Sequence, residues 1–151
     1  YHGNSLLKKL KVYKREFSND KISFSLSSAH DGYQEKYGTL FERTIVGNEE
    51  QKLLHGEDTL IVSKNDYAFL NFSIRFHVMP EAKLIQTHGG DVLISIENQG
   101  WKFKSPGQTI TIDNSLYFAD TEKVQETKCI VIEGTLNKEI NKILWSLEKS
   151  N

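Results

Sequence analysis

The sequence predicts an all-β protein, an antiparallel sandwich of about ten or more strands. Apolar residues alternate with polar ones in several short segments, and turn residues separate these segments at regular intervals. Alternation with a period of two places one face of a strand against a core and the other against water. The longest such pattern runs through Leu70, Phe72, Ile74, Phe76 and Val78.

The other strands are predicted from the same alternation or from short apolar runs. The run from Cys129 to Ile132 is continuously apolar, as expected of a strand that is covered on both faces. In chain order, the predicted strands are 22–27, 40–45, 60–62, 70–79, 92–96, 101–103, 110–112, 116–118 and 129–132.

Glycine, proline and Asx residues predict the connections between these strands, because they favour tight turns. The predicted turns are Gly47-Asn48, Gly89-Gly90-Asp91, Gln99-Gly100, Pro106-Gly107 and Asp113-Asn114. Two segments fit more than one structure. Residues 4–17 fit a helix or a chain that ends in a strand, and residues 140–147 fit a helical face or a strand through Ile143, Trp145 and Leu147.

Composition indicates one globular domain over residues 1–151 and excludes several classes of protein. There are 19 Lys and Arg against 20 Asp and Glu, and a net charge of -1 argues against a large nucleic-acid-binding surface. The single cysteine, Cys129, excludes an internal disulfide framework and a zinc site of several thiolates. We expect no membrane span, since no apolar run is long enough, and no leader is visible in this chain, so its compartment stays open. Motifs for nucleotides, paired thiolates and zinc hydrolases are absent, and we expect no cofactor.

Two groups of polar residues are candidates for chemistry. His30-Asp31-Gly32-Tyr33 follows a predicted strand, and a histidine beside a carboxylate can transfer protons. Arg75 and His77 lie two residues apart on one strand face, about 7 Å between Cα atoms, where both can contact a carboxylate ligand. The plain alternatives are a hairpin cap for the first group and a solvated sheet face for the second. For the adjacent carboxylates Glu57 and Asp58, we expect a turn and strand-start role rather than joint chemistry.

Taken together, the ordered segments resemble the C-terminal β-domain of heparinase II/III-like proteins. The family patterns are S-H-D-G-Y, a glycine, H-R-R and G-x-D, followed by R-F-H-L-H-P, G-W-x-F, S-x-Y and a final apolar strand. The similarity extends from Ala29 to Gly134. The matching segments are His30-Asp31-Gly32-Tyr33, Gly38, Arg43, Gly56-Glu57-Asp58, Arg75-Phe76-His77-Val78-Met79-Pro80, Gly100-Trp101-Lys102-Phe103, Ser115-Leu116-Tyr117, Gln125-Glu126-Thr127 and Ile130-Val131-Ile132. The resemblance also favours a strand around Trp145.

The resemblance implies a polysaccharide lyase built from an N-terminal α/α toroid and β-sheets. Such lyases cleave uronic-acid polymers by β-elimination: the sugar carboxylate is neutralised, a base removes the C5 proton, and an acid protonates the leaving O4. This chain would then form one wall of the cleft for an anionic polysaccharide, with the toroid as its partner, and would be catalytically incomplete alone. On this basis His30, Tyr33 and His77 are expected to move protons, and Asp31, Arg43 and Arg75 to bind substrate.

The sequence also departs from the family pattern. Phe41 replaces the histidine of H-R-R, so no metal ion is expected, and Met79 replaces the second histidine of R-F-H-L-H-P. The toroid has no counterpart, because too few residues precede Ser23. The alternative function is a non-catalytic carbohydrate-binding or structural module, for which Trp101 or Tyr117 would supply a sugar-stacking surface. A further alternative is a degenerate relative that cleaves nothing.

Overall fold

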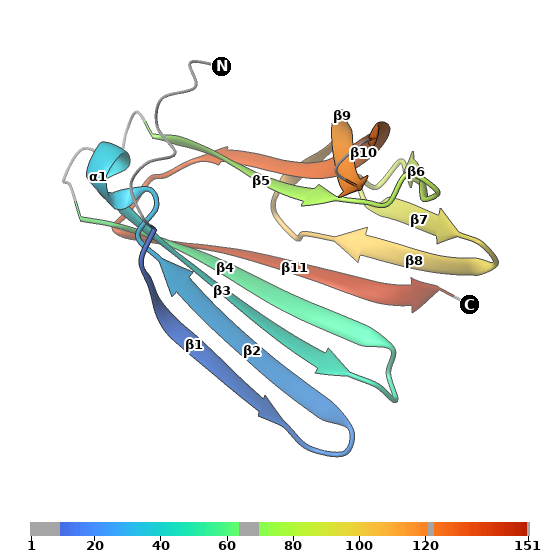
Figure 1. The fold of residues 1–151 in the computed structure, drawn as a ribbon, viewed down its shortest axis with the longest axis horizontal. Coiled ribbons are helices and arrows are strands. Elements are labelled where there is room, and N and C mark those ends of the chain that lie inside the picture. The colour runs from blue at the N-terminus through green and yellow to red at the C-terminus, as the bar shows by residue number, and fades with distance from the viewer. Residues whose placement is uncertain (1–9, 64–69, 121–122, 151) are drawn as a thin grey trace.

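A computed structural model describes residues 10–63, 70–120 and 123–150 and confirms the predicted antiparallel sandwich. Figure 1 shows its strands and the one short helix of the described residues. In chain order the elements are β1 (Val12–Asn19), β2 (Ser23–His30), α1 (Gln34–Tyr37), β3 (Thr39–Asn48), β4 (Leu53–Val62), β5 (Asn71–His77), β6 (Lys83–Gln86), β7 (Val92–Ile96), β8 (Gln99–Lys104), β9 (Thr109–Asp120), β10 (Lys123–Thr135) and β11 (Ile140–Ser150). Among the described residues, no helix is long and apolar enough to cross a membrane.

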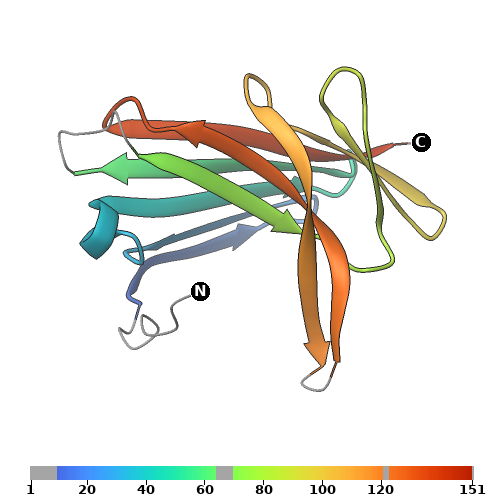
Figure 2. The ribbon, with the colours of Figure 1, turned by 90° about the horizontal axis from the view of Figure 1, so that it is seen from above.

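The strands form two antiparallel sheets of unequal size. The larger sheet has eight strands in the order β1-β2-β3-β4-β11-β8-β7-β6, and the smaller has three in the order β5-β10-β9. The last strand, β11, lies between β4 and β8 and so joins the two halves of the larger sheet. Seen from above, β5 runs along the larger sheet while the paired β9 and β10 bend across it (Figure 2). The smaller sheet therefore covers only part of the larger one, and β5 and β9 are its two edge strands.

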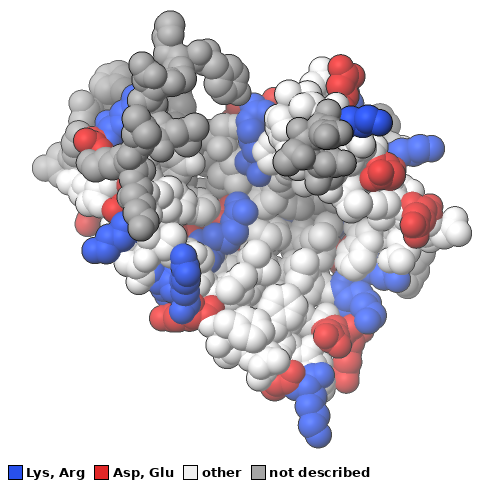
Figure 3. All heavy atoms as spheres, in the orientation of Figure 1, with Lys and Arg blue, Asp and Glu red and all other residues white. Residues whose placement is uncertain are grey.

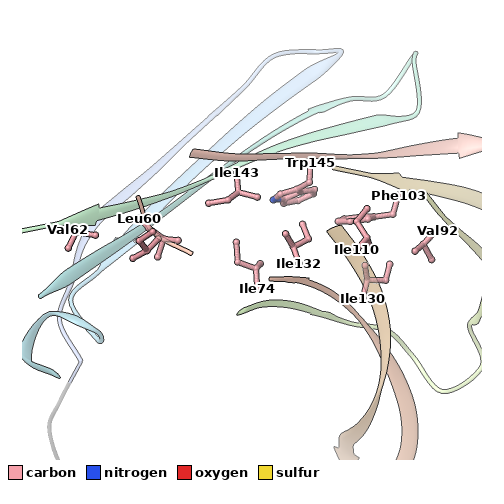
Figure 4. Packing of buried hydrophobic residues seen from close by; sticks show 11 residues of the cluster. Leu60, Val62, Ile74, Val92, Phe103, Ile110, Ile130, Ile132, Ile143 and Trp145 are labelled. Atoms are coloured by element: carbon pink, nitrogen blue, oxygen red, sulfur yellow. The ribbon is translucent and has the colours of Figure 1, made fainter. Parts of the chain in front are cut away.

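The hydrophobic core lies between the two sheets (Figure 4). The smaller sheet contributes Ile74, Ile110, Ile130 and Ile132, which face residues of the larger sheet such as Leu60, Ile143 and Trp145. Cys129, Ile130, Val131 and Ile132 are all at most 1% exposed, which confirms the strand predicted to be covered on both faces. Aromatic packing joins the layers, since the Phe76 ring lies 4.9 Å from the rings of both Phe103 and Trp145.

Three predicted turns and one predicted strand start were placed wrongly. Gly47 and Asn48 are the last two residues of β3 and pair with β4, and the turn follows at residues 49–52. Asp113 and Asn114 lie inside β9, where they pair with Cys129 and Lys128 of β10. The connection predicted at Gln99-Gly100 falls two residues earlier, where the backbone of Glu97 has a φ of 52°. Glu57 and Asp58 lie in the middle of β4 rather than at its start.

The short strand β6 was missed, because its four residues Lys-Leu-Ile-Gln carry too little alternation to be recognised. Both ambiguous segments contain strands. The part of the first segment that the structure describes includes β1, while residues 4–9 lie outside the described residues. At the other end, β11 is a strand in which Ile143 and Trp145 are buried and Leu144 is 54% exposed, as the resemblance predicted.

Candidate functional site

A cleft of about 650 Å³ lies where the free edge of β5 faces the α1 end of the larger sheet. In Figure 3 the surface is hollowed between the two lobes of the molecule. The wall from the smaller sheet includes the consecutive residues 71–75 of β5, and the opposite wall comes from β2, α1 and β3. The residues that line the cleft are His30, Tyr33, Tyr37, Thr39, Phe41, Arg43, Leu60, Leu70, Asn71, Phe72, Ser73, Ile74, Arg75 and Leu136.

The first predicted group lies where β2 ends and a loop leads into α1. The helix is a single turn that ends at Gly38, whose φ of 64° is easily adopted by glycine and whose N–H donates to the Gln34 carbonyl (2.8 Å). This tight return places the Tyr33 ring 5.5 Å from the His30 ring, which itself lies 5.3 Å from Phe41. Tyr33 is 47% exposed and therefore accessible from the cleft.

The loop also fixes which nitrogen of His30 carries hydrogen when the ring is neutral. The backbone N–H of Gly32 donates to Nδ1 of His30 at 3.1 Å. Because Nδ1 is the acceptor, the neutral ring carries its hydrogen on Nε2. His30 in this state offers a ligand an N–H donor rather than a basic nitrogen.

Asp31 has a structural role in the same loop. Its Oδ1 accepts a hydrogen bond from the backbone N–H of Lys11 (3.0 Å), and its own N–H donates to the Lys11 carbonyl (3.2 Å). These two bonds tie the chain just before β1 to the loop after β2. Asp31 is absent from the lining of the cleft.

Arg43 is held firmly at the floor of the cleft by a buried carboxylate. Its Nε and Nη2 donate to Oδ1 and Oδ2 of Asp58 at 2.5 and 2.7 Å, and Asp58 is fully buried. The indole Nε1 of Trp145 donates to the same carboxylate at 3.2 Å. The guanidinium carbon also lies 5.0 Å from the Phe76 ring and 5.6 Å from the Phe41 ring, so cation–π contacts fix its orientation.

The second predicted group lies on the outer face of the smaller sheet. Arg75 lines the cleft and donates from Nη2 to Asp113 Oδ2 at 3.1 Å. His77 lies outside the cleft lining, and its Nδ1 is 2.7 Å from the Ser115 hydroxyl. The structure thus brings His30, Tyr33, Arg43 and Arg75 to one cleft and leaves Asp31 and His77 outside it.

Some residues of the site were not predicted. Tyr37, which is 42% exposed, lines the cleft four residues after Tyr33. The sequence contains this spacing, and on a helix it would place the two tyrosines on the same face. Phe41 and Phe72 also line the cleft, but alternation alone marks them only as core residues. Trp101 and Tyr117, the alternative sugar-stacking residues, are half-buried and lie away from this cleft.

A second hollow of similar volume lies between the start of β6 and the β9–β10 hairpin, with Lys83, Ser115 and Lys128 in its lining. Lys128 donates to the Asn114 side-chain oxygen at 2.6 Å. Over the ranges that the structure describes, no group of three His, Cys, Asp or Glu side chains is arranged to hold a metal ion.

Comparison with known proteins agrees with this architecture. The structure superimposes on the heparan sulfate lyase HepC from Pedobacter heparinus with a TM-score of 0.77, at 10% identity, over 93% of this chain and 22% of that one. It superimposes on a heparinase III gene product with a TM-score of 0.73, at 9% identity and over the same share of each chain. At these identities the likeness concerns the fold.

Sequence comparison gives a different relative. The chain is 29% identical over 135 residues to FtsZ-localized protein C of Caulobacter vibrioides, covering 83% of this chain and 23% of that protein. The chain therefore spans about a quarter of the length of the relatives it matches. The family model described as "Heparinase II/III-like, C-terminal" matches residues 2–146. The chain belongs to the heparinase II/III-like C-terminal domain family, as its ordered motifs predicted.

Proposed function

We propose that this domain forms one wall of a substrate cleft in a polysaccharide lyase of the heparinase II/III type, which cleaves an anionic, uronic-acid polymer by β-elimination. The observation that supports this most is the convergence of His30, Tyr33, Arg43 and Arg75 on one cleft from three separate parts of the chain. On this proposal the domain works with a toroid domain of the same protein and is incomplete alone.

The proposed roles follow from the hydrogen-bonding capacity of each side chain. The Nε2–H of His30 donates to the uronate carboxylate and so favours the charge that develops when the C5 proton leaves. The exposed Tyr33 hydroxyl, beside the His30 ring, is the group proposed to move a proton. Arg43 and Arg75 donate to oxygen atoms of the sugar chain.

Asp31 and His77 act from outside the cleft in this proposal. Asp31 holds the loop that carries His30 and Tyr33, through its two bonds to the backbone of Lys11. His77 and Ser115 lie on the outer face of the smaller sheet, where a bound polymer that extends past Arg75 would reach them, and proton transfer by His77 would require that path.

The test is β-elimination by the full-length protein on heparan sulfate, chondroitin sulfate and alginate, followed through the near-ultraviolet absorbance of the unsaturated product. Turnover on one of these polymers is expected, with Tyr33→Phe lowering kcat by about 100-fold or more. His55→Gln is the control, because it changes an exposed histidine of β4 that is outside the cleft lining and has no part in the proposal. Absence of product from every polymer would count against the lyase proposal.

The second candidate is a non-catalytic structural or carbohydrate-binding module. The 29% identity to FtsZ-localized protein C favours it, since this exceeds the 10% identity to HepC. This candidate predicts that the full-length protein sediments with FtsZ polymers and gives no unsaturated sugar. Formation of the unsaturated product without sedimentation with FtsZ polymers would exclude the non-catalytic module and favour the lyase.

A further inference from the structure

We infer that this domain forms a symmetric dimer in which the free edge of β9 pairs with the β9 edge of a second copy. The inference goes beyond the proposed function and does not depend on it, because no residue of β9 lines the cleft. It comes from the β9–β10 hairpin, which projects beyond the larger sheet (Figure 2). Among the described strands, β9 pairs with β10 alone, and its other edge has no partner strand.

The backbone groups of β9 that face this edge belong to alternate residues. The Ile110 carbonyl accepts a hydrogen bond from the Gln86 side chain of β6 at 2.6 Å, on the side away from β10. Residues two apart on an antiparallel strand direct their N–H and C=O groups to the same side. The N–H and C=O groups of Asn114, Leu116 and Phe118 therefore also point to the free edge, where no described strand pairs with them.

This edge lacks the features that keep edge strands from pairing. Exposed edges in folded proteins are protected by charged side chains, above all lysine, by proline or by short strand length. Strand β9 has 12 residues and contains no Lys, Arg or Pro. Each of the other three edge strands carries a positive charge: Lys14 and Arg15 in β1, Lys83 in the four-residue β6, and Arg75 in β5. Strand β9 is therefore the edge most open to another strand.

The same stretch of β9 carries exposed apolar side chains. Leu116 is 52% exposed and Phe118 is 70% exposed, and the two lie on one face because they are two residues apart. In an antiparallel pairing about a two-fold axis at Tyr117, Leu116 of each copy lies opposite Phe118 of the other. Both copies then contribute the same two residues, which is the self-complementarity that a two-fold interface requires.

This register also matches charges. It places Asp120 of one copy opposite Asn114 of the other, and the Asn114 side-chain oxygen accepts a hydrogen bond from Lys128 at 2.6 Å. An acidic position of one copy thus meets a basic position of the other. A shift of the axis by one residue would set Phe118 opposite Asn114, or Leu116 opposite Asp120, and either shift loses the apolar pairing.

The test is the association state of the full-length protein, measured by sedimentation velocity over a series of micromolar concentrations. A reversible dimer is expected, and Leu116→Lys should raise its dissociation constant by about ten-fold or more, because it places a charge at the paired edge. Leu144→Lys is the matched control, because Leu144 is 54% exposed but lies on β11, inside the larger sheet. A protein that stays monomeric, or a dimer that both variants weaken equally, would overturn the inference.

Cross-linking tests the register by a second route. The two Tyr117 residues meet at the axis as a non-hydrogen-bonded pair, with Cα atoms about 4.5 Å apart, which a disulfide can span. Tyr117→Cys is therefore expected to give a covalent dimer under mild oxidation, whereas Thr111→Cys, on the same face of β9, should not. The native Cys129 is fully buried and should not react. Equal cross-linking of the two variants, or none from Tyr117→Cys, would overturn the inference.

Discussion

Trp145 packs its indole directly against the backbone of Gly56 on the neighbouring strand. A Cβ atom built on Gly56 would lie 2.0 Å from Cε2 of Trp145, far inside contact distance. The two residues are directly paired between β4 and β11, so neither strand can move away without breaking the sheet. Glycine is required here because the indole leaves no room for a side chain. Its φ does not require glycine, because it lies outside the positive range.

Replacing Gly56 should therefore destabilise the fold. We expect Gly56→Ala to lower the free energy of unfolding by about 1–3 kcal/mol, because the indole must leave its site between Phe76 and Asp58. Chemical denaturation measures this difference. Gly89→Ala is the control, because the nearest atom to its added Cβ lies 3.9 Å away. Equal stability of the two variants would show that the Trp145 contact is not limiting.

The neighbouring carboxylates Glu57 and Asp58 should differ strongly in their importance. Asp58→Ala is expected to cost about 3 kcal/mol of folding free energy, because it leaves Arg43 and the Trp145 N–H without their buried acceptor. Glu57→Ala should cost less than about 1 kcal/mol, because Glu57 pairs with Lys142 at the exposed surface. Urea unfolding of the two variants in parallel gives the comparison, and similar losses would contradict the assigned roles.

The turn between β1 and β2 should contribute stability that depends on pH. Backbone hydrogen bonds from Ile22 and Ser23, joined by one from the Ser23 hydroxyl, lower the pKa of Asp20 below its usual value. A carboxyl with a pKa depressed by folding stabilises the protein above its unfolded-state pKa and loses that contribution as pH falls through the folded-state value.

The measurement is the melting temperature of the wild type and of Asp20→Asn between neutral pH and about pH 2. The variant should melt lower at neutral pH, and the gap should close in the most acidic samples, where Asp20 is protonated. Asp113→Asn serves as a comparison from an exposed ion pair on a strand. A gap that stays constant over the whole range would contradict the role of the Asp20 charge.

The tautomer of His30 is a direct spectroscopic prediction. In ¹⁵N-correlated spectra of the neutral imidazoles, His30 should show a protonated Nε2 and an unprotonated Nδ1, because Gly32 N–H donates to Nδ1. His55, which is exposed on β4, gives the internal reference for a histidine without this hydrogen bond from a nearby backbone N–H. A His30 spectrum with hydrogen on Nδ1 would remove the carboxylate-donor role proposed for this residue.

Local patterns in the sequence predicted much of the fold, and the failures have physical causes. The apolar run 129–132 and the alternation of β5 are properties of single strands and were predictable. Asp113-Asn114 has the composition of a turn, yet pairing with β10 on one side keeps it extended. The Arg43–Asp58 pair depends on the register between β3 and β4. The two residues are fifteen positions apart in the sequence, and local patterns do not show that they lie opposite each other.

In the candidate site, only the contacts between residues close in the sequence were predictable. His30 and Tyr33 lie in one loop, so their proximity follows from sequence neighbours. The meeting of this loop with Arg75 depends on how the smaller sheet is placed over the larger one, which no local pattern encodes. Asp31 looked like a partner for His30, but the backbone of Lys11 takes its carboxylate, and that contact requires the position of β1.

Phe76 belongs to both the core and the site. Its ring touches Trp145 and Phe103 on the core side, and it supports the Arg43 guanidinium, whose carbon lies 5.0 Å away, on the other. The floor of the cleft and the interior of the domain therefore share one layer of atoms. On the proposed function, a change in the size of the ring at position 76 would tilt Arg43 and so alter the contacts of a ligand in the cleft, and substitutions in the interior of this domain would change which ligands it binds.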